Sequence, residues 1–164
     1  MSQEIVVDSL SFAREAGSLQ GELPVARLQR VLDMLVDPAG MLLYRIDGRM
    51  SERNRPQLAL KVNGAVNLQC QRCLESMVHP LEIDSLLEFV ANEDDLTQEE
   101  LEDDARDFLP ASKELDVLAL IEDEVILALP TAPRHESCTA PEAGRGEARR
   151  SPFDVLAGLK GKAE

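Results

Sequence analysis

Two alternating apolar segments, joined by a short cysteine-containing stretch, constrain the fold of this chain more than any other feature. The first segment places on one parity Leu58, Leu60, Val62, Val66, Leu68 and Cys70. The second segment places on one parity Met77, His79, Leu81, Ile83, Leu87 and Phe89. Because successive side chains of a strand point to opposite faces, each segment predicts a strand with one buried face. The stretch from Cys70 to Ser76 then connects two antiparallel strands.

The dipeptide Asn63-Gly64 lies inside the first segment and ordinarily indicates a two-residue hairpin turn. Such a turn would place Leu60 opposite Asn67 and would disrupt the apolar face. One long strand bent at Gly64 keeps the face consistent, and so does a three-residue loop. The long strand is the preferred interpretation.

Helical signals lie on both sides of these strands. Asp8 is placed to cap a short helix that ends at Gly17. Pro24 lies near the start of "LPVARLQRVLDMLV", whose apolar spacing of three and four predicts a helix of about three turns. The stretch "MLLYRIDG" that follows predicts a strand. Asp116 is placed to cap a further helix that stops at Pro130, with a strand over "VILAL" as the alternative.

These elements predict an α+β fold: an antiparallel sheet with two main packed helices and a short C-terminal helix. A sheet curled toward a barrel is the alternative form. Aromatic residues make up 3% of the chain and tryptophan is absent, so the core must consist mainly of aliphatic side chains. We expect one domain over residues 1–138 with an acidic loop at about 92–113, a flexible linker over 139–150, and an amphipathic peptide over 151–164.

The amphipathic peptide has a helix-start signal and one apolar stripe. Ser151 is placed as the cap, and the stripe consists of Phe153, Leu156 and Leu159. Such a stripe predicts docking into a groove of a partner. Packing onto the sheet of the same chain is the alternative.

The net charge of −14 is concentrated in one segment, since residues 92–124 contain 14 acidic and 2 basic side chains. Like charges in a run repel each other and stay solvated, which favours an exposed loop. The functional interpretation is a docking surface for a basic partner or a mimic of nucleic acid. Its candidate residues are Glu93, Asp94, Asp95, Glu99, Glu100, Glu102, Asp103 and Asp104.

A smaller basic region, taken to lie apart from the acidic segment, is the candidate contact for RNA or a partner. Its residues are Arg45, Arg49, Arg53, Arg55 and Arg72. Because RNA binding depends on neutralising phosphates with Lys and Arg, a chain at −14 is repelled from RNA at long range. We therefore expect a basic protein as the partner, with limited contact with RNA as the alternative. Neither DNA nor a membrane is expected as a partner.

Cys70 and Cys73 form a C-x-x-C motif with three interpretations. A redox motif needs a helix N-terminus beside the thiols, which a link between two strands does not supply. Zinc is the second, because "PRHESC" offers His135 and Cys138 at the same spacing and completes a Cys3His set. Ordinary packing is the third, with Cys70 on the buried parity. The expected cofactor is accordingly none or zinc.

The sequence contains no recognisable catalytic motif. It has neither a glycine-rich phosphate loop nor a G-x-S-x-G nucleophile motif, so we do not expect an enzyme. The N-terminal stretch lacks the basic and apolar regions of a secretory signal. An odd count of three cysteines is unlike a disulfide framework. We therefore expect a cytoplasmic location.

Four motifs occur in an order that is typical of one family. They are "CQRCLE" after an alternating strand, then "LDVLALIEDEVILALP", "PRHESC" and "SPFDVLAGLK". With these motifs the chain resembles the bacterial YceD family, the large ribosomal RNA subunit accumulation proteins. The resemblance implies a non-enzymatic factor for synthesis, processing or stability of large-subunit ribosomal RNA. It also implies that the basic partner is a ribosomal protein or an assembly factor, and that the RNA of the alternative contact is ribosomal RNA. Some members have a richer C-terminal cysteine set, whereas this chain has Cys138 alone there. A zinc-stabilised binding module is the alternative function.

Overall fold

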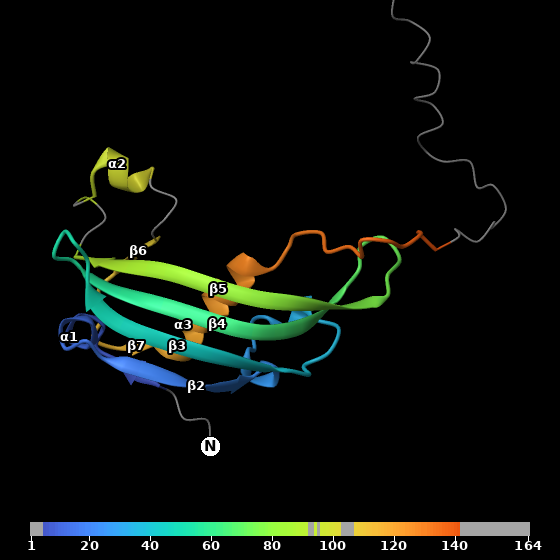
Figure 1. Ribbon diagram of the computed structural model, residues 1–164, viewed down its shortest axis with the longest axis horizontal. Helices are drawn as coiled ribbons and strands as arrows, with labels where there is room; N and C mark the ends of the chain where they lie inside the picture. Colours follow the sequence, from blue (N-terminus) through green and yellow to red (C-terminus); the bar gives the residue numbers. More distant parts are fainter. Residues whose placement is uncertain (1–4, 92–93, 95, 103–106, 142–164) are drawn as a thin grey trace, which may run out of the picture.

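The protein is described by a computed structural model over residues 5–91, 94, 96–102 and 107–141 (Figure 1). Several predicted features lie outside these residues. They are most of the expected linker, the C-terminal peptide with Phe153, Leu156 and Leu159, and the acidic residues Glu93, Asp95, Asp103 and Asp104. For Glu99, only the backbone is described.

Five strands form one sheet in the order β2-β3-β4-β5-β6. Their bounds are β2 (Ser18–Pro24), β3 (Met41–Met50), β4 (Pro56–Gln69), β5 (Ser76–Val90) and β6 (Asp107–Pro110). Neighbouring strands are antiparallel except for β5 and β6, which run parallel. In the described part of the chain β2 and β6 are the two ends of the strand order, so the sheet is open. The α+β class is confirmed, whereas the barrel alternative is wrong.

The remaining elements are short, apart from one helix. They are β1 (Val6–Val7), α1 (Ser9–Arg14), the 3₁₀ turns η1 (Val25–Arg27) and η2 (Leu32–Met34), α2 (Gln98–Leu101), β7 (Leu115–Asp116) and α3 (Val117–Ala128). β1 pairs with β7 in a separate two-stranded sheet. Figure 1 shows α3 lying across one face of the main sheet, while α2 lies beyond the end of β5. No helix in the described ranges is long and apolar enough to cross a membrane.

The two alternating segments form the central antiparallel pair, β4 and β5. Their register runs from Gln57 opposite Glu88 to Gln69 opposite Ser76. The predicted single long strand is confirmed, since β4 passes through Gly64 without a turn. A Cβ atom at Gly64 would lie 2.8 Å from the carbonyl oxygen of Met41 and 2.5 Å from Leu42 Cδ2. Glycine is needed at this position because it allows β3 to approach β4 closely.

Both predicted helix caps are present. The Asp8 carboxylate accepts the backbone N–H groups of Leu10 and Ser11 at the start of α1. The Asp116 carboxylate does the same for the first turn of α3, which ends before Pro130 as expected. Each cap satisfies backbone donors that have no partner within the helix.

The predicted three-turn helix after Pro24 is wrong, because this stretch forms only the 3₁₀ turns η1 and η2. The fully buried side chains here are Val25, Leu28 and Val31, spaced three residues apart. A 3₁₀ helix has three residues per turn, so this geometry directs all three side chains into the core. The expected pair of main helices is therefore reduced to α3 in the described part of the chain.

The main core lies between one face of the sheet and α3. Leu42 and Ile46 of β3, Leu60 of β4 and Leu87 of β5 are buried on this face. The side chains that α3 contributes are Val117, Leu120, Ile121 and Val125. On the opposite face, Leu43 and Arg45 of β3 remain exposed. The sheet thus has one packed and one largely open face, as its alternating sequence predicts.

The described part of the expected acidic loop contains two elements. Thr97 caps α2, and its hydroxyl accepts the backbone N–H of Glu100. β6 then extends the sheet by pairing Leu87–Val90 with Asp107–Pro110 in parallel. These elements bring the acidic segment beside the end of the sheet that carries Gln57 and Glu88.

Candidate functional site

The connection between β4 and β5 presents the C-x-x-C motif in a tight turn. The backbone N–H of Cys70 donates to the carbonyl of Glu75, and that of Leu74 donates to the carbonyl of Cys70, both at 2.9 Å. Leu74 adopts a left-handed backbone conformation with φ of 65°. The turn holds Cys70 and Cys73 close together at the end of the long hairpin.

The segment after α3 runs back to this turn (Figure 1). The backbone N–H of Gln71 donates to the carbonyl of Pro133 at 2.8 Å. The Arg72 guanidinium donates to the carbonyls of His135 at 3.0 Å and Cys138 at 3.1 Å. Arg72, a predicted RNA or partner contact, is therefore engaged in joining the two cysteine-containing segments.

The four predicted metal ligands meet where these segments join. The ligand atoms of Cys70, Cys73, His135 and Cys138 all lie within 4.8 Å of one another. Cys70 Sγ is 3.7 Å from Cys138 Sγ, and Cys73 Sγ is 3.3 Å from His135 Nδ1. Tetrahedral zinc, with Zn–S bonds of about 2.3 Å and Zn–N bonds of about 2.0 Å, separates two sulfurs by about 3.8 Å and a sulfur and a nitrogen by about 3.5 Å. The Cys70–Cys138 and Cys73–His135 distances are thus close to those of a tetrahedral zinc site.

The thiols differ in how readily they ionise. Burial raises the pKa of the Cys70 thiol, but backbone N–H groups outweigh this effect and lower the pKa to about 5. Two of these donors are Arg72 at 3.4 Å and His135 at 3.5 Å from Sγ. Burial, together with the neighbouring sulfurs of Cys70 and Cys73, raises the pKa of the Cys138 thiol. The cluster therefore favours the thiolate form of Cys70, and a bound cation would favour the thiolate form of Cys138 as well.

All three cysteines are free thiols. Packing accounts for the burial of Cys70. Packing does not require the Nδ1 atom of His135 to face the sulfur of Cys73, or three sulfurs to converge from distant segments. The arrangement is able to hold a metal ion through four side chains.

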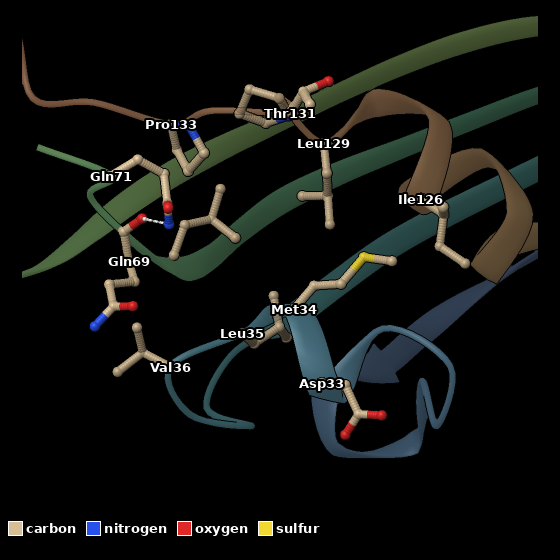
Figure 2. A pocket seen from close by; sticks show the side chains of 12 residues that line it. Asp33, Met34, Leu35, Val36, Gln69, Gln71, Ile126, Leu129, Thr131 and Pro133 are labelled. Atoms are coloured by element: carbon tan, nitrogen blue, oxygen red, sulfur yellow. Dashed lines mark hydrogen bonds between the residues drawn. The ribbon is translucent and has the colours of Figure 1, made fainter. Parts of the chain in front are cut away.

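A groove of about 720 Å³ (Figure 2) is lined in part by Gln71, next to Cys70 in the turn, and by Pro133, two residues before His135. Its walls come from η2, the end of β4 and the segment after α3. Gln71 and Pro133 line the wall that continues into the cysteine turn, and Met34 and Val36 are exposed near its other wall. The sequence alone does not reveal this groove, because its lining residues come from three separate segments.

The arginines of the predicted basic region form ion pairs or hydrogen bonds with neighbouring polar groups. Arg45 Nε pairs with Asp47 Oδ2 at 2.6 Å. Arg49 Nε donates to Gln57 Oε1 at 2.8 Å. Both interactions use side chains of the sheet itself, so these two arginines are fixed along β3.

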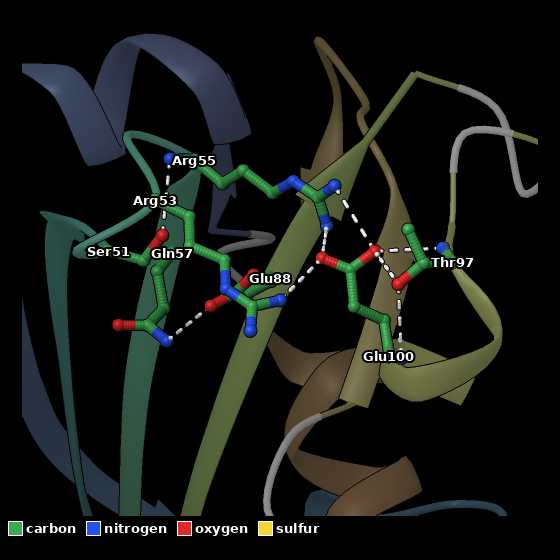
Figure 3. A network of polar contacts seen from close by, with 7 residues as sticks. All are labelled: Ser51, Arg53, Arg55, Gln57, Glu88, Thr97 and Glu100. Atoms are coloured by element: carbon green, nitrogen blue, oxygen red, sulfur yellow. Dashed lines mark hydrogen bonds and ion pairs between the residues drawn. The ribbon is translucent and has the colours of Figure 1, made fainter. Parts of the chain in front are cut away.

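Arg53 and Arg55 bind a carboxylate of the acidic segment (Figure 3). Each guanidinium approaches Glu100 Oε1 at 2.8 Å, and Glu100 is only 3% exposed. The backbone N–H of Thr97 donates to Glu100 Oε2 at 2.9 Å. The expected separation of the basic region from the acidic segment is therefore wrong at Glu100. Asp94 and Glu102, two further predicted docking residues, are exposed.

We expect the contribution of Glu100 to stability to depend on pH. The backbone N–H of Thr97 and the guanidinium groups of Arg53 and Arg55 lower the pKa of Glu100 from 4.5 to about 2, against the effect of burial. A carboxyl whose folded-state pKa is depressed stabilises the fold above its ordinary pKa, and this contribution disappears as the pH falls toward the folded-state value. Glu100→Gln should therefore lower the thermal unfolding midpoint at pH 7, with the difference from the unmodified protein shrinking between pH 4.5 and 2.

Glu102→Gln provides the matched control for this measurement. Glu102 follows the same short helix but is exposed, and its carboxylate accepts a hydrogen bond from Gln98. Its substitution should change the unfolding midpoint little at any of these pH values. A Glu100→Gln penalty that stays constant from pH 7 to the acid limit would contradict the assigned ion pairs.

Comparisons with known proteins agree with the predicted family. The model of the family described as "Large ribosomal RNA subunit accumulation protein YceD" matches residues 58–160. The chain is also 29% identical over 171 residues to a protein of that description from Haemophilus influenzae, with 96% of each chain covered. No solved structure matches the chain significantly.

In structural terms the protein is an α+β protein with an open sheet and a Cys3His cluster at one end of its long hairpin. The matched range covers more than half of the chain, and it includes all four residues of the cluster. The chain belongs to the YceD family. The family is named for the accumulation of large-subunit ribosomal RNA, and its name specifies no reaction.

Proposed function

We propose that this protein is a non-enzymatic ribosome-biogenesis factor of the cytoplasm. It would support the synthesis, processing or stability of large-subunit ribosomal RNA. The observation that carries the proposal is the family match, which runs from the start of the β4–β5 hairpin through the cysteine cluster. The name of the Haemophilus influenzae relative, aligned over almost the full length of both chains, supports the same process.

We propose zinc as the ion of the Cys3His cluster, in a structural role. Three sulfurs and one imidazole nitrogen are a ligand set that zinc commonly uses, and four protein ligands complete a tetrahedron. A site with all positions filled by the protein leaves none for substrate or water. Its effect would be to hold the segment around His135 against the turn at Cys70. This role agrees with a binding module and does not call for catalysis.

A basic ribosomal protein or assembly factor is the proposed partner. Arg53 and Arg55 are paired with Glu100, and Arg72 is bound to backbone carbonyls. The Glu100 carboxylate offsets part of the positive charge that Arg53 and Arg55 offer to phosphates, and the carbonyls occupy N–H donors of Arg72. The net charge of −14 further disfavours RNA and favours a cationic protein surface. The stripe of Phe153, Leu156 and Leu159 stays a candidate for an additional apolar contact with such a partner.

Depletion of the protein in its own bacterium tests the proposed process. We expect a selective fall in large-subunit ribosomal RNA relative to small-subunit ribosomal RNA, because the family match points to that species alone. Quantification of both RNAs by blot gives the ratio. Expression of the intact protein from a plasmid should restore it. A ratio that depletion leaves unchanged would contradict the proposed function.

A further inference from the structure

A second groove, about 610 Å³ in volume, lies between β6 and α3. Its floor includes Leu87 of β5 and Leu120 of α3, both buried in the core. Its sides include Phe108 of β6 and Leu127 of α3. The groove is distinct from the cysteine cluster, which none of its lining residues belongs to.

The apolar part of this groove continues to the protein surface. Leu127 is 75% exposed, although leucine in an amphipathic helix is usually directed toward the core. It stands at the edge of a concave surface whose floor is also apolar. Burial of this side chain and of the adjoining groove by another molecule would remove apolar area from water.

Carboxylates surround the apolar floor. Asp107, Glu114 and Asp123 are exposed, and Glu124 is buried beside the Ser85 hydroxyl, which donates to it at 2.5 Å. All four acidic side chains line the groove, and Asp116, which caps α3, lines it too. Among the described residues that line it, none is a lysine or an arginine. The rim of the groove is therefore negative.

These carboxylates are close enough to affect one another. Burial raises the pKa of Glu124, the Ser85 hydroxyl lowers it, and the negative charges of Asp107 and Asp123 raise it further. Asp123 forms an ion pair with Arg30 at 2.6 Å, which offsets its charge. A cation placed over the groove would reduce the repulsion that remains between the other carboxylates.

We infer that this groove binds a segment of a partner protein in which lysine or arginine side chains flank one or two large apolar side chains. The apolar side chains would contact Leu127 and the floor, and the cationic groups would pair with Asp107 and Glu114. β6 is the last strand in the order of the sheet, so an extended segment also has an unpaired strand edge beside it in the described part of the chain.

The same rim disfavours RNA, because phosphates would meet only carboxylates there. The inference rests on the proposed association with a basic protein and assigns it a place in the fold. This place differs from the predicted docking surface between Glu93 and Asp104. It combines the carboxylates of Asp107 and Glu114 with an apolar floor, whereas an acidic run alone supplies no apolar contact.

The test measures fluorescence anisotropy of short labelled peptides added to the full chain. One peptide carries leucines flanked by lysines, a second has glutamates in place of the lysines, and a third has serines in place of the leucines. We expect only the first to bind at physiological salt. Leu127→Ser should weaken its binding by about tenfold, since loss of an apolar side chain that the bound peptide covers can have an effect of this size. Val78→Ser is the matched control, because Val78 is 69% exposed and lies outside the groove.

Charge is tested by a second matched pair. Glu114→Lys and Glu82→Lys change the net charge equally, and both glutamates are exposed, but only Glu114 lines the groove. The first should weaken binding of the lysine–leucine peptide severalfold more than the second. The inference would be overturned by equal losses within either pair of variants, or by no binding of that peptide. It would also be overturned by a single-stranded oligoribonucleotide that competes for the groove, or by self-association that occupies it. The ratio of ribosomal RNAs after depletion is independent of these results, so the two proposals can fail separately.

Discussion

His135→Ala is expected to abolish stoichiometric zinc binding. The intact protein, purified under reducing conditions without a histidine tag, should carry about one zinc per chain, because four ligand atoms converge within 4.8 Å. Loss of a direct ligand should weaken zinc binding by more than about 100-fold, since loss of groups that only support a ligand already costs about 10- to 100-fold. Elemental analysis and competition with a chromophoric chelator measure both quantities. Cys73→Ser should have the same effect.

His79→Ala is the matched control for this experiment. The chain has two histidines, and His79 lies on β5 outside the cluster. Its replacement should leave the zinc content unchanged. Hydrogen exchange should also show that metal loss increases exchange around Cys70 and His135 while the centre of the sheet stays protected. An intact protein that contains no zinc under reducing conditions would rule out the metal and leave packing as the role of the cysteines.

Leu60→Ala is expected to destabilise the protein by about 2–5 kcal/mol, as deletion of a fully buried leucine side chain usually does. Leu60 is 0% exposed in the centre of β4, between Ile46 on β3 and Ser85 on β5. Its loss would leave a cavity in the face that packs against α3. Denaturant unfolding followed by far-ultraviolet circular dichroism gives the change in free energy of unfolding.

Leu43→Ala is the matched control, because it makes the same substitution at an exposed position. Leu43 is 54% exposed on the open face of β3, so the same substitution there should change the free energy of unfolding by no more than about 0.5 kcal/mol. Similar losses from the two variants would mean that the predicted division of the sheet into a buried and an open face does not determine stability.

The parts of the fold that follow from local patterns could be predicted from the sequence. Alternation alone indicated β4 and β5, and the passage of β4 through Gly64 followed from keeping Leu60 and Leu68 on one face. Asp8 and Asp116 marked helix starts because a side-chain carboxylate can cap backbone donors wherever the following residues are helical. The grouping of His135 with the C-x-x-C motif followed from matching ligand chemistry at matching spacing.

The features that were missed depend on contacts between distant segments. The stretch from Val25 to Val31 has a spacing that suits an α-helix, and only packing against the sheet selects 3₁₀ turns. The hydrogen bonds of Arg72 go to the carbonyls of His135 and Cys138, which lie 63 and 66 residues further along the chain. Neither contact leaves a signal in the local sequence.

The position of Glu100 is a different case, because a local signal was present. Thr97 and Glu100 have the spacing of a capping box, which indicates a helix start inside the acidic run. Charge counting treated every carboxylate of that run as equivalent and exposed. A carboxylate committed to a helix start is instead fixed in direction, and here it is directed toward Arg53 and Arg55.

The position of the cluster in the chain has a consequence for the acidic segment. Cys73 and His135 are 62 residues apart in sequence, and β5, α2, β6 and α3 all lie between them. A bound ion would act as a cross-link around this whole stretch and restrict its unfolded conformations. Because the entropy of closing a loop depends only logarithmically on its length, residues added to or removed from the acidic segment would change this stabilisation little.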